Sequence, residues 1–254
     1  MAFSFLADFA PADQVGVWQF DGNLDNELTG GAAMSAVGGW APSFVNDVIG
    51  GSPATVLSFP AMTSTQALDM PNQAGPNGGS ATTTNLWSIV MDVKFPAVGN
   101  YTSLWQTEEF ADDTDGDYFV RDTEGIGISS QYAGAYVPGD WNRLAITIDS
   151  PGAPSFEYVV NGYINGTLAS TSTTSTSPDG KEAVRAILHL FNDEDGETSA
   201  GFVNSVAFYD EVLSPNAISL LGGASAAGIR AVPEPTALVL LGSLLVGLGF
   251  IRRR

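Results

Sequence analysis

Apolar and polar residues alternate along many short stretches of this chain. In LWSIVMDVKF, residues 86–95, every second position is apolar, whereas the positions between them include Ser88, Asp92 and Lys94. A period of two is typical of a β-strand that has one dry face and one largely wet face. This pattern predicts a strand at the surface of a sandwich.

Further strand candidates are separated by Gly, Pro, Asn and Asp, and they are VGVWQF, ATVLSF, TSLWQT, DYFVRD, GIGISS, RLAITID, FEYVV, AILHLF and FVNSVAFYD. About ten to twelve short strands at this spacing predict an all-β protein in which two antiparallel sheets pack together.

Local composition also predicts the connections. Asn161-Gly162 supplies the positive φ angles of a tight hairpin turn, and Asn165-Gly166 is the alternative turn. The polar stretch TSTTSTSPDG, residues 171–180, has nothing apolar to bury and predicts an exposed loop. One short helix is expected at 214–223, from the N-cap pair Ser214-Pro215 to two closing glycines. Residues 224–231 have the composition of a linker.

The last part of the chain differs from everything before it. Residues 236–251 are apolar and uncharged, and Arg252, Arg253 and Arg254 follow them directly. A spanning helix needs about 20 mostly apolar residues, so this C-terminal hydrophobic helix is short for a permanent anchor. Arginines beside such a helix prefer the cytoplasmic side, which would place the body outside the inner membrane.

Pro233, Glu234 and Pro235 stand before the apolar run, where the two prolines keep the backbone extended. This motif, the apolar helix and the arginine cluster together resemble the PEP-CTERM sorting signal of Gram-negative bacteria, here residues 232–254. The resemblance implies transient insertion in the inner membrane. It further implies cleavage by an exosortase-type membrane protease and release to the cell surface or extracellular matrix. An ordinary tail anchor is the alternative.

The amino-acid composition limits the classes of partner that the protein can bind. The 254 residues carry a formal net charge of −19, which excludes nucleic acid as a natural partner because phosphate backbones are bound by Lys and Arg. Such a surface suits cations, neutral polymers or solubility outside the cell. The chain has no cysteine, so its stability depends on the core and on any bound Ca²⁺. Residues 1–14 lack Lys and Arg and do not form a convincing signal peptide, which predicts a misplaced start or a missing upstream segment.

Three stretches resemble the laminin G-like, concanavalin A-like jelly roll when taken in order: WNRLAITID, YVVNGYINGT and FVNSVAFYDEVLSPNAISLL. VWQFDGNLDNELTGG also looks like the first strand of that family. The resemblance covers about residues 15–223 and implies a two-sheet antiparallel jelly-roll sandwich. It implies no single activity, because this fold carries lectins, adhesion and interaction modules and glycoside hydrolases.

Three groups of acidic residues are candidate Ca²⁺ sites, because carboxylate oxygens are the ligands that Ca²⁺ prefers. In one of them Tyr118 stands where an EF-hand loop needs Gly, so an EF-hand is excluded. Solvated acidic turns are the alternative for all three. The groups are Asp21, Asn23 and Asp25, then Asp113, Asp115, Asp117 and Glu124, and last Asp193, Asp195 and Glu197.

Catalysis is the rival hypothesis. Glycoside hydrolases of this fold carry three acids at alternate positions of one strand, and the nearest match is Asp193-x-Asp195-x-Glu197. Gly196 indicates a turn there, whereas retaining hydrolysis needs two rigidly held carboxyls about 5–5.5 Å apart. We therefore predict no catalytic residues. The only histidine, His189, is expected to be a satisfied, half-buried residue that shares a strand face with Ile187 and Phe191.

Five tryptophans could stack on sugar rings, but three of them lie in alternating strands and are expected in the core; the five are Trp18, Trp40, Trp87, Trp105 and Trp141. Taken together, the sequence predicts an exported binding or structural module that recognises carbohydrate or protein with the support of Ca²⁺. Possible partners are an extracellular polysaccharide or protein, and a glycoside hydrolase is the alternative.

Overall fold

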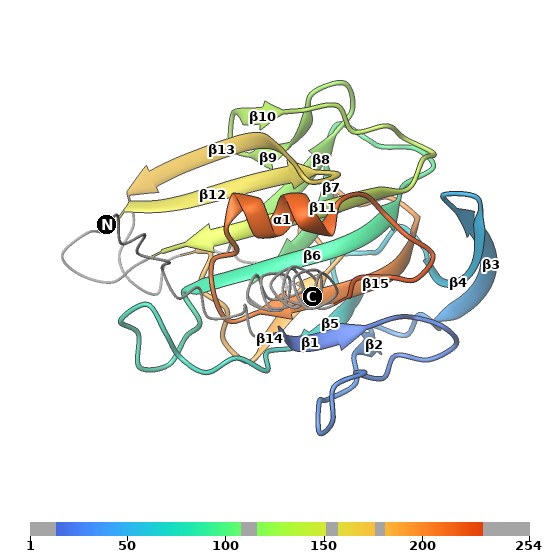
Figure 1. Ribbon diagram of the computed structural model, residues 1–254, viewed down its shortest axis with the longest axis horizontal. Coiled ribbons are helices and arrows are strands. Elements are labelled where there is room, and N and C mark those ends of the chain that lie inside the picture. Colours follow the sequence, from blue (N-terminus) through green and yellow to red (C-terminus); the bar gives the residue numbers. More distant parts are fainter. Residues whose placement is uncertain (1–13, 108–115, 151–156, 176–180, 231–254) are drawn as a thin grey trace, which may run out of the picture.

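The computed structural model describes residues 14–107, 116–150, 157–175 and 181–230. These residues form two antiparallel β-sheets and one short helix (Figure 1). The predicted two-sheet jelly-roll sandwich is confirmed. The tail at 232–254, with its predicted helix, sorting motif and arginines, lies outside the described residues. Within those residues, no helix has the length and apolar character needed to cross a membrane.

The larger sheet, called sheet A here, has eight strands. Seven follow the order β13-β12-β11-β6-β15-β4-β3, and β1 also pairs with β15. Their bounds are β1 Gln14–Trp18, β3 Ser43–Ile49, β4 Ser52–Phe59, β6 Leu86–Lys94, β11 Asn142–Asp149, β12 Glu157–Ile164, β13 Thr167–Ser175 and β15 Gly201–Tyr209.

Sheet B has seven strands in the order β10-β9-β8-β7-β14-β5-β2. Two of them, β2 and β10, have three residues each and are too short for a period of two to reveal them in the sequence. The bounds are β2 Ser35–Val37, β5 Ala67–Pro71, β7 Thr102–Gln106, β8 Asp117–Arg121, β9 Gly125–Ile128, β10 Gln131–Ala133 and β14 Ile187–Leu190.

Aromatic side chains join the inner faces of the two sheets. Trp87 of sheet A meets Trp105 of sheet B edge to face, with ring centroids 5.5 Å apart, and Trp105 stacks on Tyr118 at 5.4 Å. Trp18, Trp87 and Trp105 are completely buried, as predicted. Burial of one large apolar side chain contributes about 1.5–3 kcal/mol, so these contacts are a main source of stability.

The outer face of β6 is buried, and the prediction that it is wet was wrong. Ser88 and Asp92, which were expected on a wet face, are completely buried. The reason is a second layer: the helix α1, Pro215–Leu221, and the segment after it lie over sheet A (Figure 1). Ile218 and Ile229 from this layer pack into a small apolar cluster on the outer face. The outer face of β6 therefore belongs to the interior.

A buried ion pair holds the covering segment in place. Nε of Arg143 donates to Oδ1 of Asp92 at 2.7 Å, and Nη2 donates to Oδ2 at 2.8 Å. Arg143 also donates to the carbonyl oxygens of Leu221 at 2.6 Å and Gly228 at 3.1 Å. The segment for which the sequence predicts a linker is therefore bonded to sheet A as far as Ile229, whose side chain is 1 % exposed.

The hairpin between β12 and β13 turns at Asn165-Gly166, the alternative turn, and not at Asn161-Gly162. Asn165 and Gly166 have φ angles of 51° and 82°, as a tight turn with two positive φ angles requires. Gly162 lies within β12, where a Cβ atom would stand 1.9 Å from the hydroxyl oxygen of Tyr118. This glycine is needed for close approach between the sheets, not for a turn.

The predicted loop at 171–180 is also corrected in its first half. Residues 171–175 belong to β13 and pair with β12, and residues 176–180 lie outside the described part. Threonine has a high strand propensity because its branched side chain suits a pleated surface. Ser172 is only 4 % exposed. Residues 171–175 therefore belong to a partly buried strand, although none of them is apolar.

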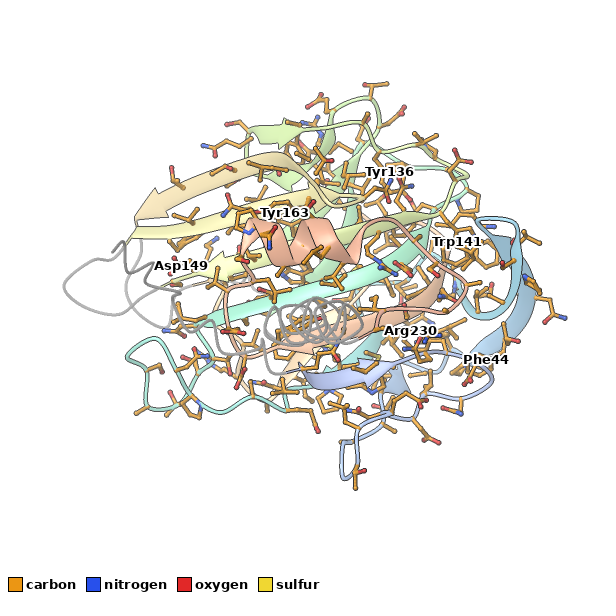
Figure 2. The ribbon with its side chains drawn as sticks, in the orientation of Figure 1. Phe44, Tyr136, Trp141, Asp149, Tyr163 and Arg230 are labelled. Atoms are coloured by element: carbon orange, nitrogen blue, oxygen red, sulfur yellow. The ribbon has the colours of Figure 1, made fainter. Side chains whose placement is uncertain are left out.

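The predicted helix is confirmed. Ser214 caps α1 by accepting a hydrogen bond from the amide of Ala217 at 3.2 Å, Pro215 follows the cap, and Gly222 ends the helix with φ 64°. Tyr163 of β12 lies against this layer (Figure 2). Good caps stabilise a helix of only seven residues, which packing on sheet A then fixes in place.

Candidate binding face of sheet B

A row of polar side chains crosses the outer face of sheet B. Each member is the register partner of the next, and their chain neighbours on these strands include core residues. Because side chains alternate between the two faces of a sheet, the row points away from the core. Its members, one from each of five adjacent strands, are Asp117, Gln106, His189, Asp69 and Ser35.

At one end of this row, acidic residues come together. Asp117 begins β8, and Asp193 and Glu194 follow β14; one carboxylate oxygen from each lies within 4.8 Å of the others. Nε2 of Gln106 donates to Oε2 of Glu194. We call Asp117, Asp193 and Glu194 the acidic cluster. Oxygen ligands in such an arrangement suit a hard cation.

The turn after β14 places Asp193 in the cluster. Phe191 has φ 59° and directs its ring into the core, where it stacks on Phe59 with centroids 4.1 Å apart. Oδ1 of Asp193 then accepts hydrogen bonds from the amides of Asp195 at 3.0 Å and Glu197 at 2.9 Å. Asp193 is held rigidly and is only 3 % exposed.

Burial and like charge both act on these acids. Burial raises the pKa of the Asp193 carboxyl, and the charge of Asp195 adds to this, although hydrogen bonds from the backbone oppose it. Burial likewise raises the pKa of Glu197, and the carboxylates of Asp193, Asp195 and Glu194 raise it further. The ionised forms repel one another, and a bound cation would relieve this repulsion.

Next to the acidic cluster, Arg121 lies between two tyrosine rings. Its guanidinium carbon is 4.4 Å from the ring centroid of Tyr101 and 4.8 Å from that of Tyr132. All three side chains are partly exposed. Burial raises the pKa of Tyr132, and the charges of Glu197 and Asp117 act in the same direction. The stack and the acids therefore share one surface, which combines flat apolar rings with hydrogen-bond acceptors.

The predicted metal ligands are distributed unevenly. Asp21 and Asp25 are exposed in a turn in which the side chain of Asn23 accepts from the amide of Asp25 at 2.7 Å, and the cluster does not include them. Asp195 is exposed and is also outside the cluster. Asp113 and Asp115 lie outside the described residues. Among the predicted ligands that the structure describes, it places Asp117 and Asp193 in one cluster, and these come from two separately predicted groups.

The residues considered for catalysis do not lie on a strand. β14 ends at Leu190 and β15 begins at Gly201, so Asp193, Asp195 and Glu197 occupy the turn between them. Two backbone amides of this turn donate to Asp193 itself. This arrangement lacks the alternate strand positions of the hydrolase pattern, as Gly196 indicated.

His189 is satisfied, as predicted, because its Nδ1 lies 2.7 Å from Oδ1 of Asp69. The residue is buried, with an exposed fraction of 3 %, and not half-buried. It does not share a face with Phe191, since the positive φ angle turns that ring into the core. His189 therefore belongs to the polar row.

Two tryptophans remain outside the fully buried core. Trp40 is half-buried and donates to the carbonyl oxygen of Ala67 at 2.9 Å. Trp141, which is labelled in Figure 2, donates to Asp47 at 3.3 Å, and Nζ of Lys94 lies 5.3 Å from its ring centroid. Neighbouring side chains therefore engage both the ring and the N–H of Trp141.

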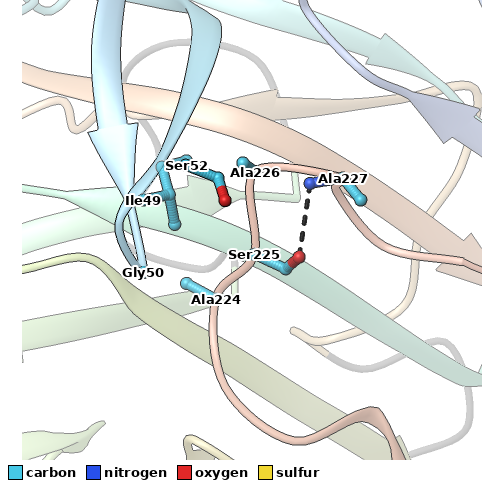
Figure 3. Close-up of a pocket in the computed structure, with 7 residues that line it drawn as sticks. All are labelled: Ile49, Gly50, Ser52, Ala224, Ser225, Ala226 and Ala227. Carbon is cyan, nitrogen blue, oxygen red and sulfur yellow. Dashed lines mark hydrogen bonds between the residues drawn. The ribbon is translucent and has the colours of Figure 1, made fainter.

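A hollow of about 450 Å³ lies between the β3–β4 turn and the C-terminal segment (Figure 3). Its lining consists mainly of glycine, serine and alanine, and Oγ of Ser225 accepts from the amide of Ala227 at 3.2 Å. No charged or aromatic side chain lines it. The hollow therefore provides few groups for recognition.

Sequence reasoning missed Tyr101, Arg121, Tyr132, Gln106 and Glu194. Tryptophan is the aromatic residue that the sequence suggests for sugar stacking, and no sequence pattern distinguishes the two tyrosines. Glu194 stands between Asp193 and Asp195 in the sequence and could have been included on that basis. Gln106 has no local pattern, since only the pairing of β7 with β8 and β14 brings it to the acids.

Comparison with known proteins supports the fold. No model of a protein family matches the chain, and no curated protein matches it. Among solved structures, it is similar to domain 4 of AbnA, a GH43 extracellular arabinanase from Geobacillus stearothermophilus in complex with arabinotriose. The TM-score is 0.57 at 16 % identity, over 83 % of this chain and 98 % of that chain.

It is also similar to a structure of botulinum neurotoxin type C, whose cell entry depends on interaction with two ganglioside molecules. The TM-score is 0.51 at 11 % identity, over 83 % of this chain and 50 % of that chain. This chain thus matches half of the neurotoxin structure. Both similarities establish a β-sandwich fold, and the narrower laminin G-like resemblance stays a prediction.

Proposed function

We propose that the protein is a non-catalytic binding module that recognises neutral carbohydrate on the outer face of sheet B. The observation that carries this proposal is the stack of Tyr101, Arg121 and Tyr132 beside the acidic cluster. Tyrosine rings offer a flat apolar surface to a sugar ring, and neighbouring carboxylates accept hydrogen bonds from sugar hydroxyls. The net charge of −19 disfavours polyanionic glycans.

The test is a glycan array with the full chain, followed by calorimetric titration of the best ligand. Arabinotriose, a neutral oligosaccharide that is present in one of the two similar structures, is a suitable first probe. We expect Tyr101→Ala and Tyr132→Ala each to weaken binding roughly tenfold, a factor that corresponds to about 1.4 kcal/mol.

Val48→Ala is the matched control, because Val48 is an exposed apolar residue on sheet A, 59 % exposed. It should leave the affinity unchanged. Absence of binding to any neutral glycan, or equal affinity in the tyrosine variants and the wild type, would refute the proposed function.

We further propose that the body is exported and delivered by the C-terminal tail. Support comes from the order of Pro233-Glu234-Pro235, the apolar run and Arg252–Arg254 in the sequence. An exosortase-type protease in the inner membrane would cut near the motif and release the body to the surface or matrix. Mass spectrometry of the surface form should then show a chain that ends near Val232, whereas an intact C-terminus would indicate a plain anchor.

A further inference from the structure

Gln106 is a buried side chain with one unsatisfied atom beside the acidic cluster. It is completely buried, and its register partners are Asp117 on β8 and His189 on β14. Nε2 donates to Glu194, but Oε1 is buried without a hydrogen-bond partner in the described part of the chain. Burial of an unpaired acceptor costs free energy. Both atoms belong to one amide, so this oxygen also lies next to the carboxylate of Glu194.

The oxygens of the cluster lie close enough together to bind a single Ca²⁺ ion. Ca²⁺ binds six to eight oxygens at about 2.3–2.6 Å, so two ligands on opposite sides of the ion are about 4.6–5.2 Å apart. The three carboxylate oxygens lie within 4.8 Å of one another. Mg²⁺ binds at about 2.0–2.1 Å in strict octahedral geometry and dehydrates reluctantly, which suits this arrangement less well.

We propose that Asp117, Asp193 and Glu194 bind Ca²⁺, with the amide oxygen of Gln106 as a fourth protein ligand. Rotation of the amide by half a turn exchanges Nε2 for Oε1. Without the ion the amide donates to Glu194, and with the ion it supplies an oxygen. Water completes the coordination, because half-exposed Asp117 and Glu194 leave the site open to solvent on one side.

Such an ion would link the start of β8 to the turn after β14. The turn is already fixed on its inner side, where the amide of Ser103 donates to the carbonyl oxygen of Glu197 at 2.8 Å. On the turn, the carboxylates of Asp193 and Glu194 lie close to that of Asp117 on β8, and the three negative charges repel one another. Ca²⁺ converts that repulsion into a bridge beside Tyr132. The inference does not depend on carbohydrate binding, since the metal alone is the probe.

The first experiment is titration of the full chain, stripped of metal, with CaCl₂ by calorimetry, together with thermal melts in CaCl₂ and in chelator. We expect one site with a dissociation constant on the order of 10⁻⁴ M, as in other extracellular modules. At a hundredfold excess over that constant, the midpoint should rise by roughly 5–10 °C. Absence of both binding heat and a midpoint shift would overturn the proposal.

The second experiment assigns the ligands. Asp117→Asn and Glu194→Gln should each weaken Ca²⁺ binding at least tenfold. Asp195→Asn is the matched control, because Asp195 is an exposed acid of the same turn that lies outside the cluster. It should bind Ca²⁺ as the wild type does, apart from a small loss of long-range attraction. Equal affinity in the two ligand variants and the control would overturn the assignment.

Thermal melts in chelator show whether these carboxylates act as metal ligands or only stabilise the fold by themselves. Without Ca²⁺ the carboxylates repel one another, so Glu194→Gln and Asp117→Asn should melt at or above the wild-type midpoint. In CaCl₂ the order should reverse. A ligand variant that melts several degrees lower than the wild type in both conditions would show that its carboxylate stabilises the fold by itself, which contradicts the proposal.

Discussion

Each sheet carries an arginine on its outer face, and the two are held in different ways. Arg143 on sheet A is 5 % exposed and pairs with Asp92, which is 0 % exposed. Arg121 on sheet B is 23 % exposed and pairs with Glu124, which is 50 % exposed. The first ion pair is covered by the chain's own C-terminal segment, whereas the second stays in contact with solvent and with two tyrosine rings.

This difference separates stability from recognition. On sheet A, α1 and the segment that follows cover the outer face around β6 and make polar residues such as Ser88 part of the interior. On sheet B, partly exposed Tyr101 and Tyr132 face solvent beside acids that repel one another. We infer that substitutions on the outer face of sheet A change folding, and that those on sheet B change binding.

The largest effect should come from the buried ion pair. Arg143→Ala leaves Asp92 as an unpaired buried charge and removes the donors to Leu221 and Gly228, so we expect a loss of about 3–5 kcal/mol in the free energy of unfolding. Urea denaturation followed by tryptophan fluorescence measures it. Arg121→Ala is the matched substitution on sheet B and should cost less than about 1 kcal/mol. Equal losses would show that the two faces do not differ.

Two tyrosines provide a second comparison. Tyr163 on sheet A is 4 % exposed and packs beneath the covering layer, so Tyr163→Ala should cost about 3 kcal/mol through the cavity it leaves. Tyr132 on sheet B is partly exposed, and Tyr132→Ala should cost about 1 kcal/mol. The same urea series measures both. A larger loss for Tyr132 than for Tyr163 would reverse the roles assigned to the two faces.

The C-terminal segment provides a third test. A chain that ends at 223 loses the buried Ile229, the acceptor at Gly228 and the amide of Ser225, which donates to Asp92 at 3.3 Å. We expect a loss of about 2 kcal/mol. A chain that ends at 230 keeps all of these contacts and should differ from the full chain by less than about 0.5 kcal/mol. If both truncated chains unfold alike in urea, the segment after α1 is only a linker.

The sequence predicted the inner face of sheet A correctly and its outer face poorly. On β6 the alternation locates the buried residues, but it cannot show that Ser88 and Asp92 are buried too. Ser88 donates to the carbonyl oxygen of Glu211 at 2.8 Å and accepts from the amide of Leu213 at 2.9 Å. These partners lie more than a hundred residues away in the chain, so no local pattern contains them.

The sequence identified two residues of the candidate site but did not show that they lie together. Asp117 and Asp193 were assigned to two different acidic groups, because sequence distance was the only measure of proximity. They meet because β8 and β14 both pair with β7, which also places Gln106 between them. This arrangement follows from strand order, and a single sequence does not contain strand order explicitly.

The smallest effect concerns the helix that covers sheet A. Ser214→Ala removes the side-chain oxygen that accepts from the amide of Ala217, and should cost about 1 kcal/mol. Ser219→Ala is the matched control, because Ser219 is exposed in the same helix and alanine is the better helix former. It should leave stability unchanged or raise it by a few tenths of a kcal/mol. Urea denaturation of both variants measures the two effects. Loss of the cap lowers the stability of the whole protein only if α1 contributes to the folded state. Equal urea midpoints for the two variants would therefore show that the layer over sheet A contributes little to stability.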